Sequence, residues 1–103
     1  MERIERIKEM LLKSPSDSFL QHALALELLK IGDKEEATKL FEKVLGENEN
    51  YVGTYYQLAK LYERNNRIPD AIAVYEKGME KAKEAGEQHA YNELRSAYEE
   101  VID

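Results

Sequence analysis

The sequence predicts an all-α fold in which about six helices form antiparallel pairs that stack on one another. Apolar residues recur at helical spacing along most of the chain, and glycine, asparagine and proline interrupt this spacing at intervals. The chain also repeats itself, because large residues meet large ones and small residues meet small ones after a shift of 34 positions. A fixed period of this length indicates one helical unit copied along the chain. No stretch carries a competing strand pattern.

The first two helices are expected at residues 2–13 and 17–31. Asp17 or Ser18 can cap the second helix, because either side chain accepts a hydrogen bond from a free backbone N–H of the first turn. The face of this helix that packs into the stack combines residues three or four positions apart. These residues are Gln21, Leu24, Ala25 and Leu28.

The remaining helices are expected at residues 34–46, 51–65, 68–85 and 88–101. Gly32 with Asp33, and Asn65 with Asn66, are turn sequences that end the helix before them. Pro69 falls in the first turn of the fifth helix, where its missing N–H costs nothing. The predicted helices are therefore separated by short turns, which favour antiparallel neighbours.

The repeated motif occurs twice in full and once in part. It reads Gln21-x-x-Leu24-Ala25-x-x-Leu28 with Ala37-x-x-x-Phe41, then Tyr55-x-x-Leu58-Ala59-x-x-Tyr62 with Ala71-x-x-x-Tyr75, and finally Tyr91-x-x-Leu94-Arg95-x-x-Tyr98. It resembles the tetratricopeptide repeat family, whose pattern is W-x-x-L-G-x-x-Y, then A-x-x-x-F, then a proline. The chain departs from the pattern at Glu49, which stands where a proline would fall, and at Arg95, which replaces a small residue.

The resemblance implies a right-handed α-solenoid that forms a single domain over residues 1–103. Its units are expected at residues 1–17 (a half unit), 18–51, 52–85 and 86–103 (a terminal half unit). In this family the first helix of each unit lines the concave side, where ligands generally bind. The resemblance therefore implies an adaptor or scaffold for protein–protein interaction, with a peptide or helical segment of a partner protein in the concave groove.

Composition and charge narrow the function further. The 103 residues suffice for one domain, and a formal net charge of −6 opposes binding to nucleic acid and to anionic membrane surfaces. The absence of cysteine removes disulfides, thiolate catalysis and cysteine-ligated metals. The chain starts without the apolar run of a secretory signal, and its richest apolar segment is too short to span a bilayer. A cytoplasmic protein is expected.

Residues with catalytic potential are sparse, so we expect no enzyme and no cofactor. His22 and His89 are the only histidines, and the sequence contains neither a nucleophile motif nor a glycine-rich phosphate loop. His89 and Glu93 lie four positions apart on one helix face and could form one edge of a metal site. Two ligands rarely suffice, so solvated surface residues are the preferred interpretation and no metal is expected.

A second stripe of apolar residues on the second helix predicts the binding groove. This stripe lies about 130° around the helix from the packed face, and its counterparts fall on the fourth and sixth helices, where it continues to Glu99. Lys30 and Arg64 occupy matching positions on the rim and could steer an acidic partner. The predicted peptide-binding residues are Phe19, His22, Leu26, Leu29, Lys30, Tyr56, Lys60, Arg64, His89, Asn92 and Ser96.

Two alternatives stay open at this point. Phe19 and Leu26 could be covered by the first helix or by a loop, because large exposed apolar patches are uncommon on monomers. The groove could also bind a second copy of the chain, which would make it a self-associating structural module and a homodimer. Some family members hold a terminal carboxylate with a lysine and an asparagine; this chain has His22, Leu26 and Gln57 at the matching positions, so that clamp is not expected.

Overall fold

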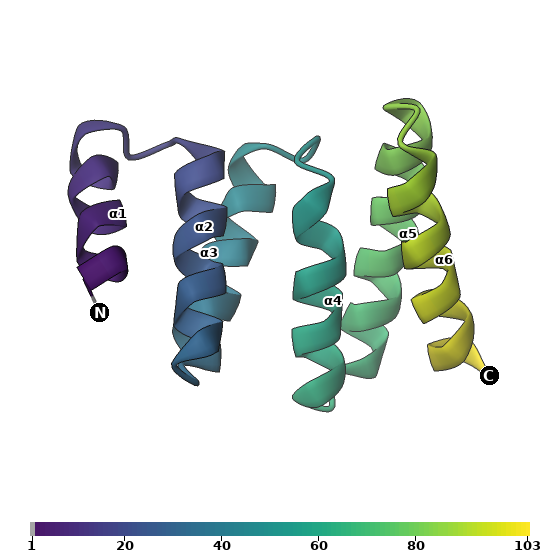
Figure 1. Ribbon diagram of the computed structural model, residues 1–103. Helices are drawn as coiled ribbons and strands as arrows, with labels where there is room; N and C mark the ends of the chain where they lie inside the picture. The colour runs from purple at the N-terminus through teal and green to yellow at the C-terminus, as the bar shows by residue number, and fades with distance from the viewer. Residues whose placement is uncertain (1) are drawn as a thin grey trace. The chain divides into compact units, whose positions relative to one another are not determined.

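The computed structural model describes residues 2–103, which form six α-helices and contain no strand (Figure 1). The helices are α1 (Glu2–Lys13), α2 (Ser18–Lys30), α3 (Lys34–Glu47), α4 (Gly53–Arg64), α5 (Ile68–Glu84) and α6 (Gln88–Ile102). Every predicted helix is present, with its ends within two residues of the expected positions. Among these helices, none combines the length and the apolar character needed to cross a membrane.

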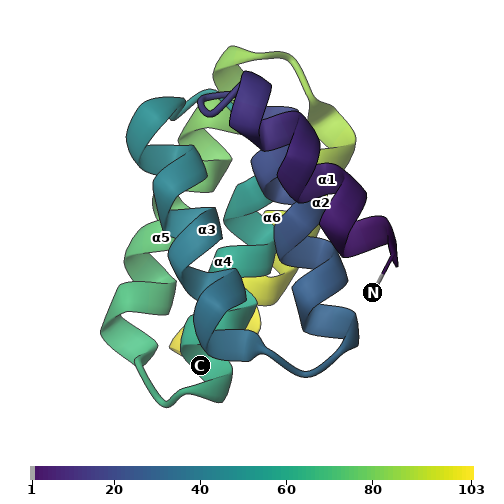
Figure 2. The same cartoon turned by 90° about the vertical axis from the view of Figure 1, so that its left-hand side faces the viewer.

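The chain forms two compact units, residues 1–48 and residues 49–103. In the first unit, α1 and α3 both pack against α2. In the second unit, α5 packs against both α4 and α6, whereas α4 and α6 touch each other only slightly. Figures 1 and 2 show the three helices of each unit side by side. The repeat boundaries that the sequence suggests remain a prediction.

The helix ends use the turn chemistry that the sequence indicates. Asp17 caps α2 by accepting a hydrogen bond from the N–H of Leu20, and Asp33 caps α3 in the same way. Gly32 and Asn66 end α2 and α4 with φ values of 85° and 60°, which glycine and asparagine adopt at least cost. In both turns the N–H of the following residue donates to the carbonyl five positions before it, which completes a Schellman motif. These bonds run from Asp33 to Leu28 at 2.9 Å and from Arg67 to Tyr62 at 2.8 Å.

The core of each unit follows the repeat. Ala25 and Ala37 in the first unit, like Ala59 and Ala71 in the second, are completely buried. Small residues at these positions let the paired helices approach closely. The aromatic position of the motif is also buried in both units, as Phe41 and as Tyr75. The predicted packing face of α2 is confirmed, because Gln21, Leu24, Ala25 and Leu28 are all buried.

Equivalent residues of the two units make the same contact by different chemistry. The buried amide of Gln21 donates from Nε2 to the carbonyl of Pro15 at 2.8 Å. Thirty-four positions later, the hydroxyl of Tyr55 donates to the carbonyl of Glu49. Tyrosine is larger than glutamine, and the helix opposite makes room for it with Gly78, where unit one has the buried Val44. A Cβ atom on Gly78 would lie only 2.7 Å from the Cβ atom of Tyr55.

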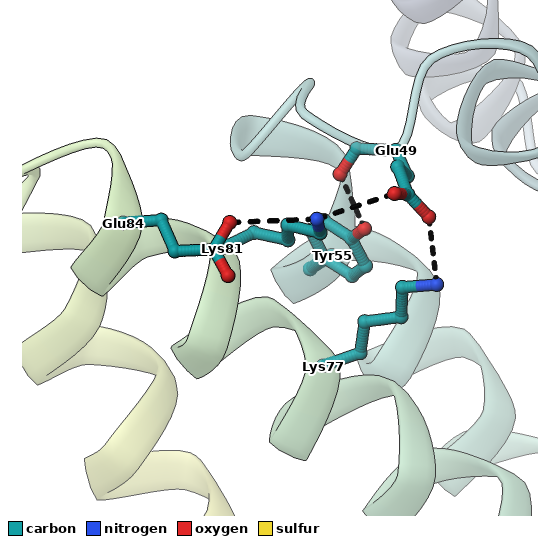
Figure 3. A network of polar contacts seen from close by, with 5 residues as sticks. All are labelled: Glu49, Tyr55, Lys77, Lys81 and Glu84. Carbon is teal, nitrogen blue, oxygen red and sulfur yellow. Dashed lines mark hydrogen bonds and ion pairs between the residues drawn. The ribbon is translucent and has the colours of Figure 1, made fainter.

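Glu49 links the start of the second unit to α5 (Figure 3). Its carboxylate accepts from the ammonium groups of Lys77 and Lys81, at 2.9 and 3.2 Å, while its carbonyl accepts from Tyr55. Lys81 also lies 3.5 Å from Glu84. The hydrogen bonds and charges of the two lysines hold the pKa of the Glu49 carboxyl below its usual value. These contacts fix the turn before α4 at the position where the family pattern has a proline.

Candidate functional site: a groove between α4 and α6

The second unit contains a groove of about 390 Å³ between α4 and α6. It forms because both helices pack on α5 and only slightly on each other, which leaves a trough between them. α4 contributes an aromatic ring and a lysine, and α6 contributes two carboxylates with small and polar residues. The residues that line the groove are Tyr56, Lys60, His89, Asn92, Glu93, Ser96, Ala97 and Glu100.

Packing on α5 fixes the α6 side of the groove. Leu94 and Ala97 are 1% and 4% exposed, so they anchor the inner face of α6. The lining residues of α6, which include Ala97, recur every three or four positions, which places them along one edge of the helix. Ala97 and Ser96 are small, and together they leave open space between the larger side chains of Glu93 and Glu100.

On the α4 side, the positive charge of Lys60 is already compensated. Its ammonium lies 3.7 Å from the carboxylate of Glu63 and 5.6 Å from the centre of the Tyr56 ring. The Glu63 carboxylate also accepts a hydrogen bond from the hydroxyl of Tyr75. Burial first, and then this neighbouring carboxylate, raise the pKa of the Tyr75 hydroxyl far above its usual value. Lys60, Glu63 and Tyr75 therefore form a connected polar group beside the groove.

On the α6 side, the negative charges are not compensated. Glu93 and Glu100 are exposed, and neither has an ion-pair partner within residues 2–103. Asn92 accepts a hydrogen bond from the side chain of Gln88 at 2.9 Å, and its own amide N–H groups have no acceptor among residues 2–103. The groove therefore offers an aromatic face, a small-residue floor, polar hydrogen-bonding groups and two carboxylates that are available to a ligand.

Five of the residues predicted from the sequence line this groove, namely Tyr56, Lys60, His89, Asn92 and Ser96. Arg64 is exposed near the end of α4 but does not line it. The prediction missed Glu93, Ala97 and Glu100, and it placed Glu99 on the stripe instead. Glu99 pairs with Arg95 at 3.1 Å. The missed residues lie four, eight and eleven positions after His89, which is the spacing of one helix face. The prediction instead used steps of three, seven and ten positions, and the last of these leads to Glu99.

The predicted residues on α2 belong to the first unit and differ in exposure. Phe19 is 66% exposed, whereas Leu26 and Leu29 are half-buried. Lys30 is exposed and pairs with Glu27 at 3.1 Å, and Glu27 also binds Arg3 of α1. The structure thus leaves Phe19 exposed and covers part of Leu26. This result lies between the two alternatives, a fully exposed apolar stripe and a stripe that the first helix or a loop covers.

His22 of α2 packs into the first unit. Its ring centre lies 5.3 Å from the ring centre of the buried Phe41, and the two planes are tilted by 56°. Burial lowers the pKa of His22, because the low-dielectric surroundings disfavour the charged imidazolium. The sequence predicted this residue on the groove stripe, and the structure places its ring against Phe41 of α3. Nowhere in residues 2–103 do three or more potential metal ligands cluster.

Comparison with known proteins places these observations in a family. The sequence profile of the tetratricopeptide repeat family matches residues 28–98. A tetratricopeptide repeat domain protein from Salinibacter ruber, solved by NMR, is 45% identical and superposes with a TM-score of 0.80; the match covers 84% of this chain and 88% of that one. The crystal structure of the Salinibacter ruber protein gives 44% identity, 84% and 96% coverage and a TM-score of 0.81.

More distant proteins are also similar to this chain. The TPR2B domain of yeast Sti1, solved as a complex with pHsp70, is 19% identical and has a TM-score of 0.87, with 96% of this chain and 79% of that chain covered. A mouse protein, interferon-induced protein with tetratricopeptide repeats 3, is 22% identical over 100 residues, which are 97% of this chain. This chain spans only 24% of that curated relative. Together with the repeat and the six helices, these matches show that the chain belongs to the tetratricopeptide repeat family.

Proposed function

We propose that this domain is a protein–protein interaction module whose groove between α4 and α6 binds a peptide or helical segment of a partner protein. One observation carries the proposal. Five residues picked from the repeat pattern as ligand-facing, on two helices more than twenty positions apart, line a single groove. A concave site with an aromatic face and a few polar groups is typical of ligand-binding sites in proteins.

The related structures support binding of this kind without naming the partner. The TPR2B and TPR2AB domains of yeast Sti1 were solved as complexes with pHsp70 and pHSP90, respectively. Both are 19% identical to this chain, so their partners are not transferred. What we carry over as a proposal is the general role of the fold, a binding module without catalysis.

The α2 residues are a separate candidate contact, which belongs to the first unit. Phe19 is exposed, and the half-buried Leu26 and Leu29 leave part of their side chains accessible. Such apolar side chains are suitable anchors for a partner helix. We propose them as secondary contacts, and the groove between α4 and α6 as the principal one. Self-association through the groove is the less favoured alternative, because two copies that each carry a net charge of −6 repel one another.

The test selects ligands without assuming their sequence. A phage-displayed library of random peptides of about 15 residues is panned on the intact domain, and the enriched peptides are measured by fluorescence anisotropy. Ser96→Phe fills the groove, and we expect it to weaken these peptides by about tenfold or more. Ser16→Phe adds the same ring to an exposed turn of the first unit and should leave the affinity unchanged.

The outcomes separate the alternatives. Enriched peptides that bind a monomeric domain and lose affinity in Ser96→Phe support the proposed function. If no peptide is enriched above a bare support, or if Ser96→Phe binds as well as Ser16→Phe, the groove is not the binding site. Sedimentation equilibrium over a range of concentrations tests the other occupant, because a dimer that Ser96→Phe dissociates would assign the groove to a second copy.

A further inference from the structure

The charge of the groove indicates which partners it accepts. We propose that the groove recognises a cationic segment that presents two lysine or arginine side chains about 10 Å apart, one for Glu93 and one for Glu100. The proposal rests on the proposed function and specifies the chemistry of the partner at the same site. It differs from a site for acidic segments, which the rim residues Lys30 and Arg64 suggest when the sequence is read alone.

The two carboxylates provide the spacing. Glu93 and Glu100 are seven positions apart on α6, which is two helical turns or about 10.5 Å along the axis. Both line the groove, both are exposed, and neither forms an ion pair within the described part of the chain. A ligand that carries one positive charge would satisfy one of them, and a ligand with two charges at the matching separation would satisfy both.

The single cation of the groove does not offset them. Lys60 is held by Glu63 at 3.7 Å and lies over the ring of Tyr56, so an acidic ligand would compete with a carboxylate that is already in place. Outside the groove, Lys30 of the first unit is likewise paired with Glu27. Ionic attraction in the groove therefore favours cations over anions, which is electrostatic complementarity of the kind that selects partners.

The surroundings of the carboxylates fit the side chains that carry the charge. Ala97 and Ser96 form a shallow floor between the two carboxylates, on which the apolar stem of a lysine or arginine can lie. The Tyr56 ring on the opposite wall already has the Lys60 ammonium over it, so it contributes apolar contact area to the groove and not a free face for a second cation. The net charge of −6 adds long-range attraction for a basic segment and opposes a second copy of this chain.

The random-peptide selection also tests this inference when the charge of the enriched peptides is scored. We expect paired lysine or arginine residues, three or four positions apart in extended peptides or about seven apart in helical ones. Glu93→Gln/Glu100→Gln should lower the affinity of these peptides by about five- to tenfold. The control Glu80→Gln/Glu99→Gln removes the same net charge from exposed positions outside the groove and should change the affinity by less than about twofold.

Each outcome bears on one of the two proposals. A loss specific to Glu93→Gln/Glu100→Gln that shrinks as salt is added supports recognition of a cation pair. Enriched acidic or neutral peptides that are blocked by Ser96→Phe would overturn this inference and leave the proposed function standing. An equal loss in the control variant would also overturn it, because the attraction would then come from the net charge and not from the groove. Failure of the library to yield any groove-dependent peptide would reject both.

Discussion

At the scale of single residues, Glu49 shows how an exposed carboxylate can replace a proline in fixing a turn. The pKa of its carboxyl is lowered from the ordinary 4.5 by Lys77 and Lys81, and the pKa values of both lysines are raised from 10.5 in return. A lowered carboxyl pKa stabilises the fold above 4.5 and loses this effect as the pH falls. A raised ammonium pKa stabilises below 10.5 and loses its effect as the pH rises.

We therefore predict that Glu49→Gln destabilises the second unit between those two pH limits and has little effect in acid. Chemical denaturation of both proteins at neutral pH and at about pH 3 measures this. The stability difference should shrink as the carboxyl becomes protonated. A difference of the same size at both pH values would mean that the ion pairs do not contribute, and that the bond from Tyr55 to the Glu49 carbonyl alone fixes the turn.

Leu24 and Leu26 of α2 provide a second test at residue scale. Leu24 is 6% exposed on the packing face, so Leu24→Ala should cost about 2–5 kcal/mol through lost contacts and the cavity left behind. Leu26 is half-buried, so Leu26→Ala should cost only about 1 kcal/mol. Denaturant titration of the two variants gives both values. Equal losses would show that Leu26 is a core residue, and it would then drop out of the proposed secondary contacts.

At the scale of helices, Gly78 sets the distance between α5 and its neighbours. An added Cβ atom would meet the Cβ atom of Tyr55 at 2.7 Å and a methyl group of Leu94 at 3.1 Å. We predict that Gly78→Ala destabilises the protein by about 1–3 kcal/mol, although alanine is the better helix former. Gly46→Ala is the control, because a Cβ atom added at Gly46 meets nothing within 4 Å. This substitution should stabilise α3 slightly, since alanine is the better helix former. If denaturant titration showed that Gly78→Ala raises the free energy of unfolding, α4 and α5 would be packed more loosely than the 2.7 Å contact indicates.

The helices themselves could be predicted from the sequence, because apolar spacing and turn residues are local signals. Asp17 caps α2 and Asn66 ends α4 as those signals indicate. Gln21 and Val44 of the first unit correspond to Tyr55 and Gly78 of the second. That these two changes compensate each other in volume could not be predicted. The pattern shows a large residue at one position and a glycine at another, but only three-dimensional packing shows that the two fill the same space.

At the scale of the whole molecule, the groove was predicted in part. Helical spacing identified residues on α4 and α6 that share a groove, since the repeat pattern predicts that each of these helices starts a unit. It missed Glu93 and Glu100, because a rotation of α6 about its axis by a few tens of degrees is enough to bring a neighbouring row of residues to face the groove. That rotation is set by the burial of Leu94 and Ala97 in the second unit, which a periodicity argument does not resolve.

The terminal helix is expected to be part of the cooperative fold. α6 buries Leu94 and Ala97 and packs on α5, so deleting residues 91–103 exposes the face of α5 that it covers. We predict that this deletion lowers the thermal unfolding midpoint of the second unit, since stacked repeats share their interfaces. Removal of residues 102–103, which are exposed, is the control and should have little effect. An unchanged midpoint in the longer deletion would contradict the role of α6 as a packed cap.

The most direct test of the proposed binding role is a ¹⁵N–¹H NMR titration of the intact domain with an enriched peptide. The groove account predicts that the amide signals of Tyr56, Lys60, Asn92, Ser96 and Ala97 shift most, and that Ser96→Phe abolishes these shifts. Smaller shifts near Phe19 would indicate the secondary contacts on α2. A peptide that binds while the signals of α4 and α6 stay in place would contradict the account, because the groove would then have no part in binding.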